Sequence, residues 1–220
     1  MRESSDLSRL QQEDEVKPTS VKLPSQVKRR IGIYSGTFDP VHAGHIAFAL
    51  QAAQKAQLDT VIFAPERNPH RKRHTTHFAH RVAMIRRAIR PYRQLGIIEL
   101  EDKTFSVLRT LPRLKQAYPG AKLVFLCGSD VLSHMVDWPH IESLLFDVEL
   151  CVGRRHNETE QQVTHAVEGL PVMPPAVTIF ESHAASVSSS QIRAAIRERR
   201  GVRGLLLSVK VYAQREWLYI

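Results

Sequence analysis

The chain has 220 residues, of which 43% are hydrophobic, and this composition suits one α/β domain with a full core. Its net charge of +9 favours phosphate-bearing partners, but no basic run alternates with aromatic residues, which argues against nucleic acid as a partner. No apolar run approaches the roughly 20 residues that cross a bilayer, and no apolar signal core opens the sequence, so we expect a cytoplasmic protein without a membrane partner.

Residues 1–29 form the first predicted segment, a flexible tail. They are polar, mixed in charge and without a sustained hydrophobic period, so they offer little apolar surface to bury. We therefore expect the folded domain to extend over residues 30–220.

Apolar runs of strand length alternate with helical patterns through the rest of the chain. Strands are predicted over residues 30–36, 60–64, 97–100, 123–127, 148–152 and 177–180. Helices are predicted over residues 43–57, 78–90, 105–117, 130–136, 139–146, 188–199 and 205–217, with one weak helix within 154–175. This alternation predicts an α/β fold, in which helices flank a parallel sheet. Cys127 and Cys151 fall in or beside two of the strands and are expected to be buried free thiols in a reducing compartment.

Four polar segments follow predicted strands, over residues 35–45, 65–77, 128–138 and 181–190. Ligands of parallel sheets bind at the carboxyl ends of the strands. Since these segments all lie at such ends, we expect them to converge on a single site.

The stretch from Tyr34 to His45 links the first strand to the first helix. A tight loop before a helix N-terminus attracts an anion, because first-turn N–H groups lack partners and the macrodipole adds positive potential. If the helix begins near Val41, the spacing of His42 and His45 places both imidazoles on one face, where they could donate to one phosphate group. The alternative is that the two histidines only cap the helix.

The loop over residues 65–77 is strongly basic and could clamp a polyphosphate. We single out Lys72 for that role, while a solvated charge run remains the alternative for its neighbours Arg67, His70, Arg71 and Arg73.

Three hydroxyls, on Ser188, Ser189 and Ser190, precede the helix that contains Arg193. Hydroxyl and N–H groups at such a helix start can grip the β- and γ-phosphates of a nucleotide, and Arg193 adds positive charge. The alternative is a plain N-cap, which needs only one serine.

The order of these motifs resembles that of a known superfamily. Gly36-Thr37-Phe38-Asp39-Pro40 followed by His42-x-Gly44-His45 is similar to the first signature of the HIGH-motif nucleotidyltransferases. The run Val187-Ser-Ser-Ser-x-Ile-Arg resembles their second signature, Ile-Ser-Ser-Thr-x-Ile-Arg. Further segments resemble bacterial nicotinate-mononucleotide adenylyltransferases, namely Pro65 to Lys72, His80-Arg81, Gly128-Ser129-Asp130 with the downstream Trp138, and Trp217-Leu218-Tyr219.

The resemblance covers about residues 30–219 and implies a Rossmann-like nucleotidyltransferase fold. It implies adenylyl transfer from ATP to nicotinate mononucleotide, which gives deamido-NAD and pyrophosphate in NAD biosynthesis. Catalysis would rest on alignment and charge stabilisation. Mg²⁺ is expected on the ATP phosphates, largely ligated by water, with no dedicated protein metal site.

The resemblance also implies roles for individual residues. The catalytic residues would be His42, His45, Lys72 and Arg193. ATP and its phosphates would be bound by Ser35, Gly36, Thr37, Phe38, Gly44, Gly128, Asp130, Ser188, Ser189 and Ser190. The acceptor would be bound by Phe105, Ser106 and Trp138.

Three departures from the family pattern lie on the acceptor side. Ser35-Gly36 replaces the usual Gly-Gly, and Asn68-Pro69-His70-Arg71-Lys72 stands where the family has Pro-Pro-His-Lys. The segment Thr104–Leu111 has lost an acid and gained a residue relative to Ser-Tyr-Thr-x-Asp-Thr-Leu. A related adenylyl- or cytidylyltransferase with another acceptor therefore stays open, as does a non-enzymatic nucleotide- or RNA-binding protein. The choice between nicotinate and nicotinamide mononucleotide, and the oligomeric state, are also open.

Overall fold

The computed structural model describes residues 29–69, 74–183, 187–201 and 203–220. Residues 1–28 of the predicted tail lie outside the described residues, so the tail boundary stays a prediction. Lys72 and its neighbours at 70–73 also lie outside them.

Parallel strands form one sheet in the described part of the chain. They are β1 (Arg30–Gly36), β2 (Thr60–Pro65), β3 (Leu95–Ile97), β4 (Lys122–Gly128), β5 (Glu149–Arg154) and β6 (Val177–Glu181). Their order is β3-β2-β1-β4-β5-β6, the order of doubly wound Rossmann folds. The chain runs outward from β1 to β3 and then returns to β4, so a crevice is expected between the carboxyl ends of β1 and β4.

Helices cover both faces of the sheet. They are α1 (Ala43–Lys55), α2 (Phe78–Ile89), α3 (Val107–Ala117), α4 (Ser129–Met135), α5 (Ile141–Asp147), α6 (Glu160–Glu168), α7 (Ser189–Arg197) and α8 (Leu207–Arg215). Phe63 of β2 packs in a core with α1, α2 and α8, whereas its neighbour Ile62 packs in a second core with α3 to α6. Alternate strand residues point to opposite faces, so each apolar run supplies both cores.

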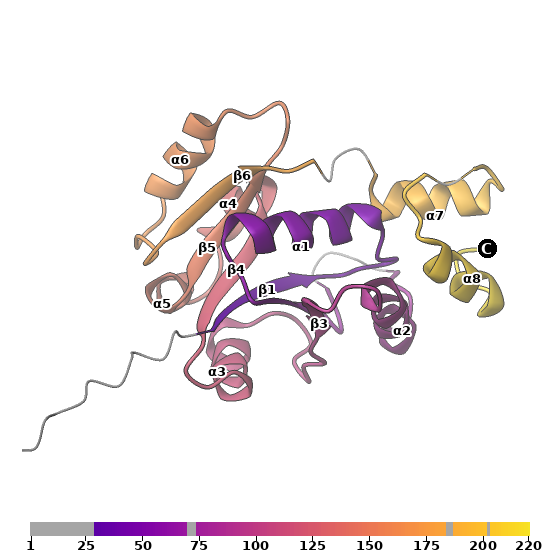
Figure 1. Ribbon diagram of the computed structural model, residues 1–220, viewed down its shortest axis with the longest axis horizontal. Helices are drawn as coiled ribbons and strands as arrows, with labels where there is room; N and C mark the ends of the chain where they lie inside the picture. The colour runs from indigo at the N-terminus through magenta and orange to yellow at the C-terminus, as the bar shows by residue number, and fades with distance from the viewer. Residues whose placement is uncertain (1–28, 70–73, 184–186, 202) are drawn as a thin grey trace, which may run out of the picture.

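The last two helices lie beyond one end of the sheet. Figure 1 shows α7 and α8 together beside the N-terminal end of α1. The backbone N–H of Ala43 donates to the carbonyl of Gly204 at 2.8 Å, which joins the start of α1 to the loop before α8. The C-terminal part of the chain is thus held against the loop that follows β1.

Two predicted elements have wrong boundaries in ways that bear on the site. The third strand is Leu95–Ile97 rather than 97–100. Ile98 N–H donates to Phe63 O at 3.0 Å, but Pro65 of β2 has no N–H to continue the ladder. Helix α3 begins at Val107 rather than 105, which leaves Phe105 and Ser106 in the preceding loop. Helix α1 begins at Ala43, as predicted, and His42 is its N-cap residue.

Other predictions about the elements are confirmed. The first strand has the predicted bounds, and β2, β4, β5 and β6 each lie within two residues of theirs. Cys127 and Cys151 are buried free thiols. Among the helices of the described residues, we find none that is both long and apolar enough to span a bilayer.

Candidate active site

A cavity of about 1050 Å³ opens at the carboxyl ends of the strands, where β1 and β4 meet. Its wall comes from the loops after all six strands, the loop after β2 contributing Glu66, so the predicted convergence of strand-end loops is found. Of the residues predicted for the site, those that line the cavity are Ser35, Gly36, Thr37, Phe38, His45, Phe105, Ser106, Gly128, Asp130 and Trp138. Loops that sequence reasoning treated separately therefore form one binding space.

His42 and His45 form a contacting pair at the start of α1. The backbone N–H of His42, the N-cap residue, donates to Nδ1 of His45 at 3.2 Å, and the ring centroids lie 3.8 Å apart. Since Nδ1 of His45 accepts a hydrogen bond, the neutral ring carries its proton on Nε2. His45 lines the cavity, and Phe38 packs edge-on against it with centroids 5.0 Å apart.

His42 lies behind His45 and is nearly enclosed, with 5% of its surface exposed. Its Nδ1 is buried and has no hydrogen-bond partner among the described residues. Burial disfavours the charged form and lowers the pKa of His42 to about 4. The imidazole is therefore neutral at pH 7 and can donate one hydrogen bond.

The predicted phosphate residues of the second signature contact the loop after β1. Ser188 caps α7 by accepting from the Gln191 N–H at 3.2 Å. Ser189 Oγ donates to the Pro40 carbonyl at 3.0 Å, and Arg193 Nη1 donates to the Asp39 carbonyl at 2.6 Å. These contacts hold the second signature against the loop after β1, and none of its described residues lines the cavity.

Several predicted residues therefore lie near the cavity without lining it within the described part of the chain. They are His42, Gly44, Ser188, Ser189, Ser190 and Arg193. The anion site expected at the α1 N-terminus also has fewer donors than predicted, because the N–H groups of His42, Ala43 and His45 are already bound to His45 Nδ1, Gly204 O and His42 O.

Asp130 stands at the tip of the turn after β4. Its carboxylate pairs with Arg155 at 3.1 Å, and both side chains are more than half exposed, at 58% and 63%, so a ligand can readily displace this pairing. A β-carbon added at Gly128 would lie 2.5 Å from Asp130 Oδ1. A side chain at this position would therefore force the exposed Asp130 carboxylate to turn away from the strand end.

Aromatic rings form the wall predicted to bind the acceptor. Trp138 lies 6.0 Å from Phe105 and meets Phe125 edge-on at 5.8 Å, measured between ring centroids. The indole is half-buried, so it both lines the cavity and packs on the second core. The loop before α3 is held by Thr110, whose Oγ1 accepts from Ser106 N–H at 2.9 Å and donates to buried Asp102 at 3.1 Å.

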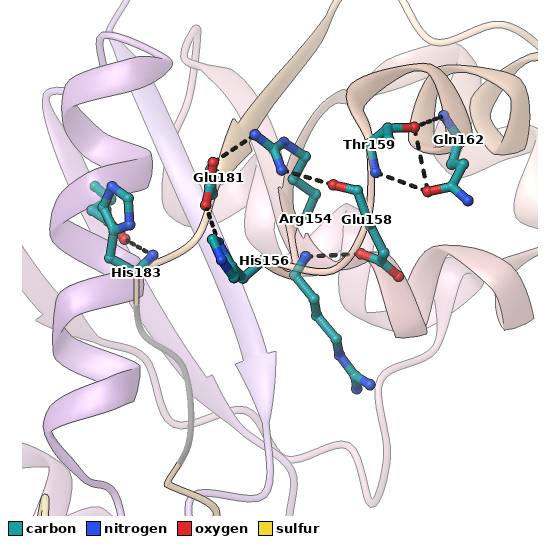
Figure 2. A network of polar contacts seen from close by, with 9 residues as sticks. Arg154, His156, Glu158, Thr159, Gln162, Glu181 and His183 are labelled. Atoms are coloured by element: carbon teal, nitrogen blue, oxygen red, sulfur yellow. Dashed lines mark hydrogen bonds and ion pairs between the residues drawn. The ribbon is translucent and has the colours of Figure 1, made fainter.

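The ends of β5 and β6 supply cavity residues that were not predicted, namely Arg155, His156, Asn157 and Ser182. Figure 2 shows Glu181 between Arg154 and His156, at 2.6 Å and 2.7 Å respectively. The hydrogen bond from His156, with the charge of Arg154, lowers the pKa of Glu181. The strand-end rule that selected the other loops would also have selected residues 153–157.

Arg81 has a structural role that sequence reasoning missed. Its side chain is 0% exposed and donates to the backbone carbonyls of residues in three segments, Thr37, Glu66, Arg67 and Thr76, at 2.7–2.9 Å. A buried guanidinium needs such acceptors. Arg81 thereby fixes the loop after β1 against both described ends of the basic loop.

Comparison with known proteins identifies the family. The cytidylyltransferase-like family model matches residues 33–195. A probable nicotinate-nucleotide adenylyltransferase of Desulfitobacterium hafniense is 31% identical over 198 residues, which cover 87% of this chain and 96% of the relative. The nicotinate-nucleotide adenylyltransferase of Bacillus subtilis is 31% identical over 197 residues, covering 87% of this chain and 98% of the relative.

A solved structure supports the fold. The nicotinic acid mononucleotide adenylyltransferase of Plasmodium falciparum complexed with NaAD superposes with a TM-score of 0.72 at 19% identity, covering 87% of this chain and 97% of that one. With the strand order described above, this similarity confirms the predicted Rossmann-like nucleotidyltransferase fold. The sequence matches confirm the predicted family of enzymes. The chain therefore belongs to the nicotinate-nucleotide adenylyltransferase family.

Proposed function

We propose that this chain transfers the adenylyl group of ATP to nicotinate mononucleotide, forming deamido-NAD and releasing pyrophosphate. The observation that carries the proposal is a single cavity of about 1050 Å³ with His45 on the wall near β1 and Trp138 on the wall after β4. Histidine donors suit a phosphate, and a flat aromatic ring suits a pyridine. The cavity can thus hold a reacting phosphate and a pyridine ring at once.

The reaction needs alignment more than a covalent intermediate. An oxygen of the acceptor 5′-phosphate attacks the α-phosphorus of ATP, a new P–O bond forms, and the bond to the bridging oxygen of pyrophosphate breaks with its electron pair. His45 is oriented to donate from Nε2 to a phosphate oxygen as charge develops there. His42 holds that orientation through its backbone N–H.

The residues proposed to hold the β- and γ-phosphates are Lys72, Ser189, Ser190 and Arg193. Lys72 lies outside the described residues. Ser189 and Arg193 donate to the carbonyls of Pro40 and Asp39. To bind ATP phosphates, each side chain would either leave its carbonyl or donate to the carbonyl and a phosphate oxygen at once. Their second contribution is to hold the loop after β1 in place.

The structure is compatible with Mg²⁺ carried mainly by phosphates and water. Among the described residues, no group of three or more potential ligands lies together. Both carboxylate oxygens of Asp39 are engaged, one by Tyr219 and one by the Thr76 N–H. Asp130, at the cavity wall, could contact a ribose hydroxyl or one water of the ion. When bound, Mg²⁺ would neutralise charge on the triphosphate.

The test is pyrophosphate release by the full-length chain with ATP, Mg²⁺ and separate phosphorylated acceptors. We expect release with nicotinate mononucleotide at a higher kcat/KM than with nicotinamide mononucleotide. Release only with an acceptor that lacks a pyridine would contradict the proposal and favour a related transferase. No release with any acceptor, despite ATP binding, would favour a binding protein.

A further inference from the structure

We propose that Tyr219, the penultimate residue, is a positioning residue for the loop over residues 36–45 and acts through Asp39. The proposal rests on the adenylyl transfer proposed above, because that loop carries the histidine pair. Tyr219 Oη donates a hydrogen bond to Asp39 Oδ1 at 2.7 Å. The two residues are 180 positions apart, so the end of the chain closes onto the first loop of the site.

The partner of Tyr219 is buried and its other oxygen is also engaged. Asp39 is 2% exposed, and its Oδ2 accepts from the Thr76 N–H at 3.1 Å. A buried carboxylate that loses a donor keeps its desolvation cost without compensation. Removal of the Tyr219 hydroxyl would therefore leave Asp39 to find a new donor, and the loop would shift with it.

Other contacts from the C-terminal part of the chain meet the same short segment. Arg193 donates to the Asp39 carbonyl, and Ser189 donates to the Pro40 carbonyl. The carbonyl of Gly204 accepts from Ala43 N–H at 2.8 Å. Asp39 and Pro40, which precede His42 by three and two positions, and Ala43, which follows it, are thus held from outside the sheet, and Tyr219 supplies the contact to a charged side chain.

The backbone at the chain end has a defined and unfavourable conformation. Trp217 has a φ of 53° and Tyr219 a φ of 68°, both in the left-handed region that non-glycine residues seldom adopt. Such conformations persist where surrounding contacts hold them. Leu218, between them, packs against the first core. The terminus is therefore fastened to the domain, although chain ends commonly fray.

The hydroxyl is kept in its donor form. Burial, followed by the negative charge of Asp39, raises the pKa of Tyr219 well above its ordinary value. Tyr219 is not among the residues that line the cavity in the described part of the chain. Its effect must pass through Asp39 to the alignment of the histidines, which would alter turnover more than substrate affinity.

The test compares two variants of the full-length chain, Tyr219→Phe and the control Tyr212→Phe. Tyr212 is a second tyrosine in the C-terminal part; it is buried, and its hydroxyl makes a 2.9 Å hydrogen bond with His80 Nδ1 rather than with the loop over residues 36–45. For Tyr219→Phe we expect kcat to fall about tenfold while both KM values stay within about twofold. Tyr212→Phe should keep wild-type kcat even where it lowers the melting temperature as much.

Hydrogen exchange of the backbone over residues 38–45 provides a readout that does not depend on turnover. We expect faster exchange there in Tyr219→Phe than in the wild type or in Tyr212→Phe. Unchanged kcat in Tyr219→Phe, or a loss of kcat equal to that of Tyr212→Phe, would overturn the inference. If the wild type adenylylates no acceptor, the proposed function fails, and hydrogen exchange alone tests the role of Tyr219. Faster exchange over residues 38–45 only in Tyr219→Phe would support a positioning role, and equal exchange in both variants would overturn it.

Discussion

The backbone N–H of His42 donates to Nδ1 of His45 at 3.2 Å, and this contact fixes how the His45 imidazole is presented to the cavity. Because Nδ1 accepts, the neutral ring donates from Nε2. The pair thus serves both the helix start and the site. The sequence had left capping and phosphate binding as alternatives, and the geometry allows one residue to do both.

Substitution at His45 separates these two roles. We expect His45→Ala and His45→Asn each to lower kcat by about 10²–10³, because both lack the donor at the Nε2 position. His45→Asn keeps an acceptor near the position of Nδ1. Its free energy of unfolding should therefore exceed that of His45→Ala by about 1 kcal/mol. Steady-state pyrophosphate release and urea titrations measure the two effects. If folded His45→Asn kept the wild-type kcat, His45 would only cap the helix and would take no part in turnover.

Because the His42 imidazole is buried, we expect the free energy of unfolding to depend on pH. Burial lowers the pKa of His42 to about 4 from its ordinary value of 6.5, so the unfolded chain binds the proton more readily between these values. This contribution to the free energy of unfolding is complete above pH 6.5 and is lost as pH falls toward 4. We expect wild type to lose about 2 kcal/mol more than His42→Asn between pH 7.5 and 5, as measured by urea unfolding.

The control for this titration is His165→Asn, since the His165 side chain is 92% exposed. This variant should follow the pH dependence of the wild type. A His42→Asn variant that loses stability as steeply as wild type over the same range would show that His42 is not the group responsible.

The apolar runs predicted most strands because a strand covered on both faces is apolar throughout. The bounds of the third strand were predicted wrongly because it is a short edge strand that contains Gly96, and the apolar residues after Ile97 belong to a loop. Its actual extent depends on Pro65 of the neighbouring strand, which the pattern of the third strand itself does not contain.

The candidate site was predictable where its residues are neighbours in the sequence. The loop after β1 has a signature, so His45 was found, and Gly128 and Asp130 were found at a strand end. The contact between Tyr219 and Asp39 joins positions 180 residues apart and leaves no local pattern. The carbonyls bound by Arg81 likewise belong to the backbone, which is present whatever residue occupies the position, so the sequence carries no signal for these contacts.

The loop that carries Phe105 offers a prediction about the acceptor. The segment Thr104–Leu111 lacks the acid of the family pattern, but Asp102 lies just upstream of it. Its carboxylate accepts a hydrogen bond from Thr110 Oγ1 at 3.1 Å. We expect Thr110→Val, which keeps the shape but not the hydroxyl, to raise the acceptor KM about fivefold and leave the KM for ATP unchanged. Steady-state kinetics with each substrate varied measure this split.

The control for the loop is Glu101→Gln. Its carboxylate is 86% exposed and lies 3.8 Å from Arg113, so its loss should change neither KM. If Thr110→Val raised both KM values alike, the link from Asp102 to the acceptor wall would be wrong.

Trp217 has a left-handed backbone conformation that glycine adopts most readily. It follows α8 with a φ of 53°, and the hydrogen bonds Trp217 N to Gln214 O and Leu218 N to Ala213 O form a Schellman motif. A glycine there carries no left-handed penalty, so Trp217→Gly should raise the free energy of unfolding by about 1 kcal/mol. Urea titration measures this gain. Trp217→Ala keeps the penalty and should show none; an equal gain in both variants would instead point to loss of the exposed ring.

Trp138 has features of both an acceptor-binding ring and a packing residue of the second core. Its indole lines the cavity, as an acceptor-binding ring would, and it also contacts Phe125 edge-on at 5.8 Å between ring centroids. A pyridinium ring is attracted to an indole face by stacking and by its positive charge. A substitution that keeps apolar volume but removes the aromatic face can therefore separate binding from packing.

We expect Trp138→Leu to raise the KM for nicotinate mononucleotide about tenfold while the KM for ATP stays within about twofold, because only the acceptor meets the indole face. Trp138→Phe keeps a ring and should recover most of the acceptor affinity. Urea unfolding should show that the two variants are destabilised alike, by about 1–3 kcal/mol, since both lose part of the packing on the second core. If Trp138→Phe raised the acceptor KM as much as Trp138→Leu, or if both KM values rose in proportion to lost stability, the indole would be a packing residue and the acceptor would bind elsewhere in the cavity.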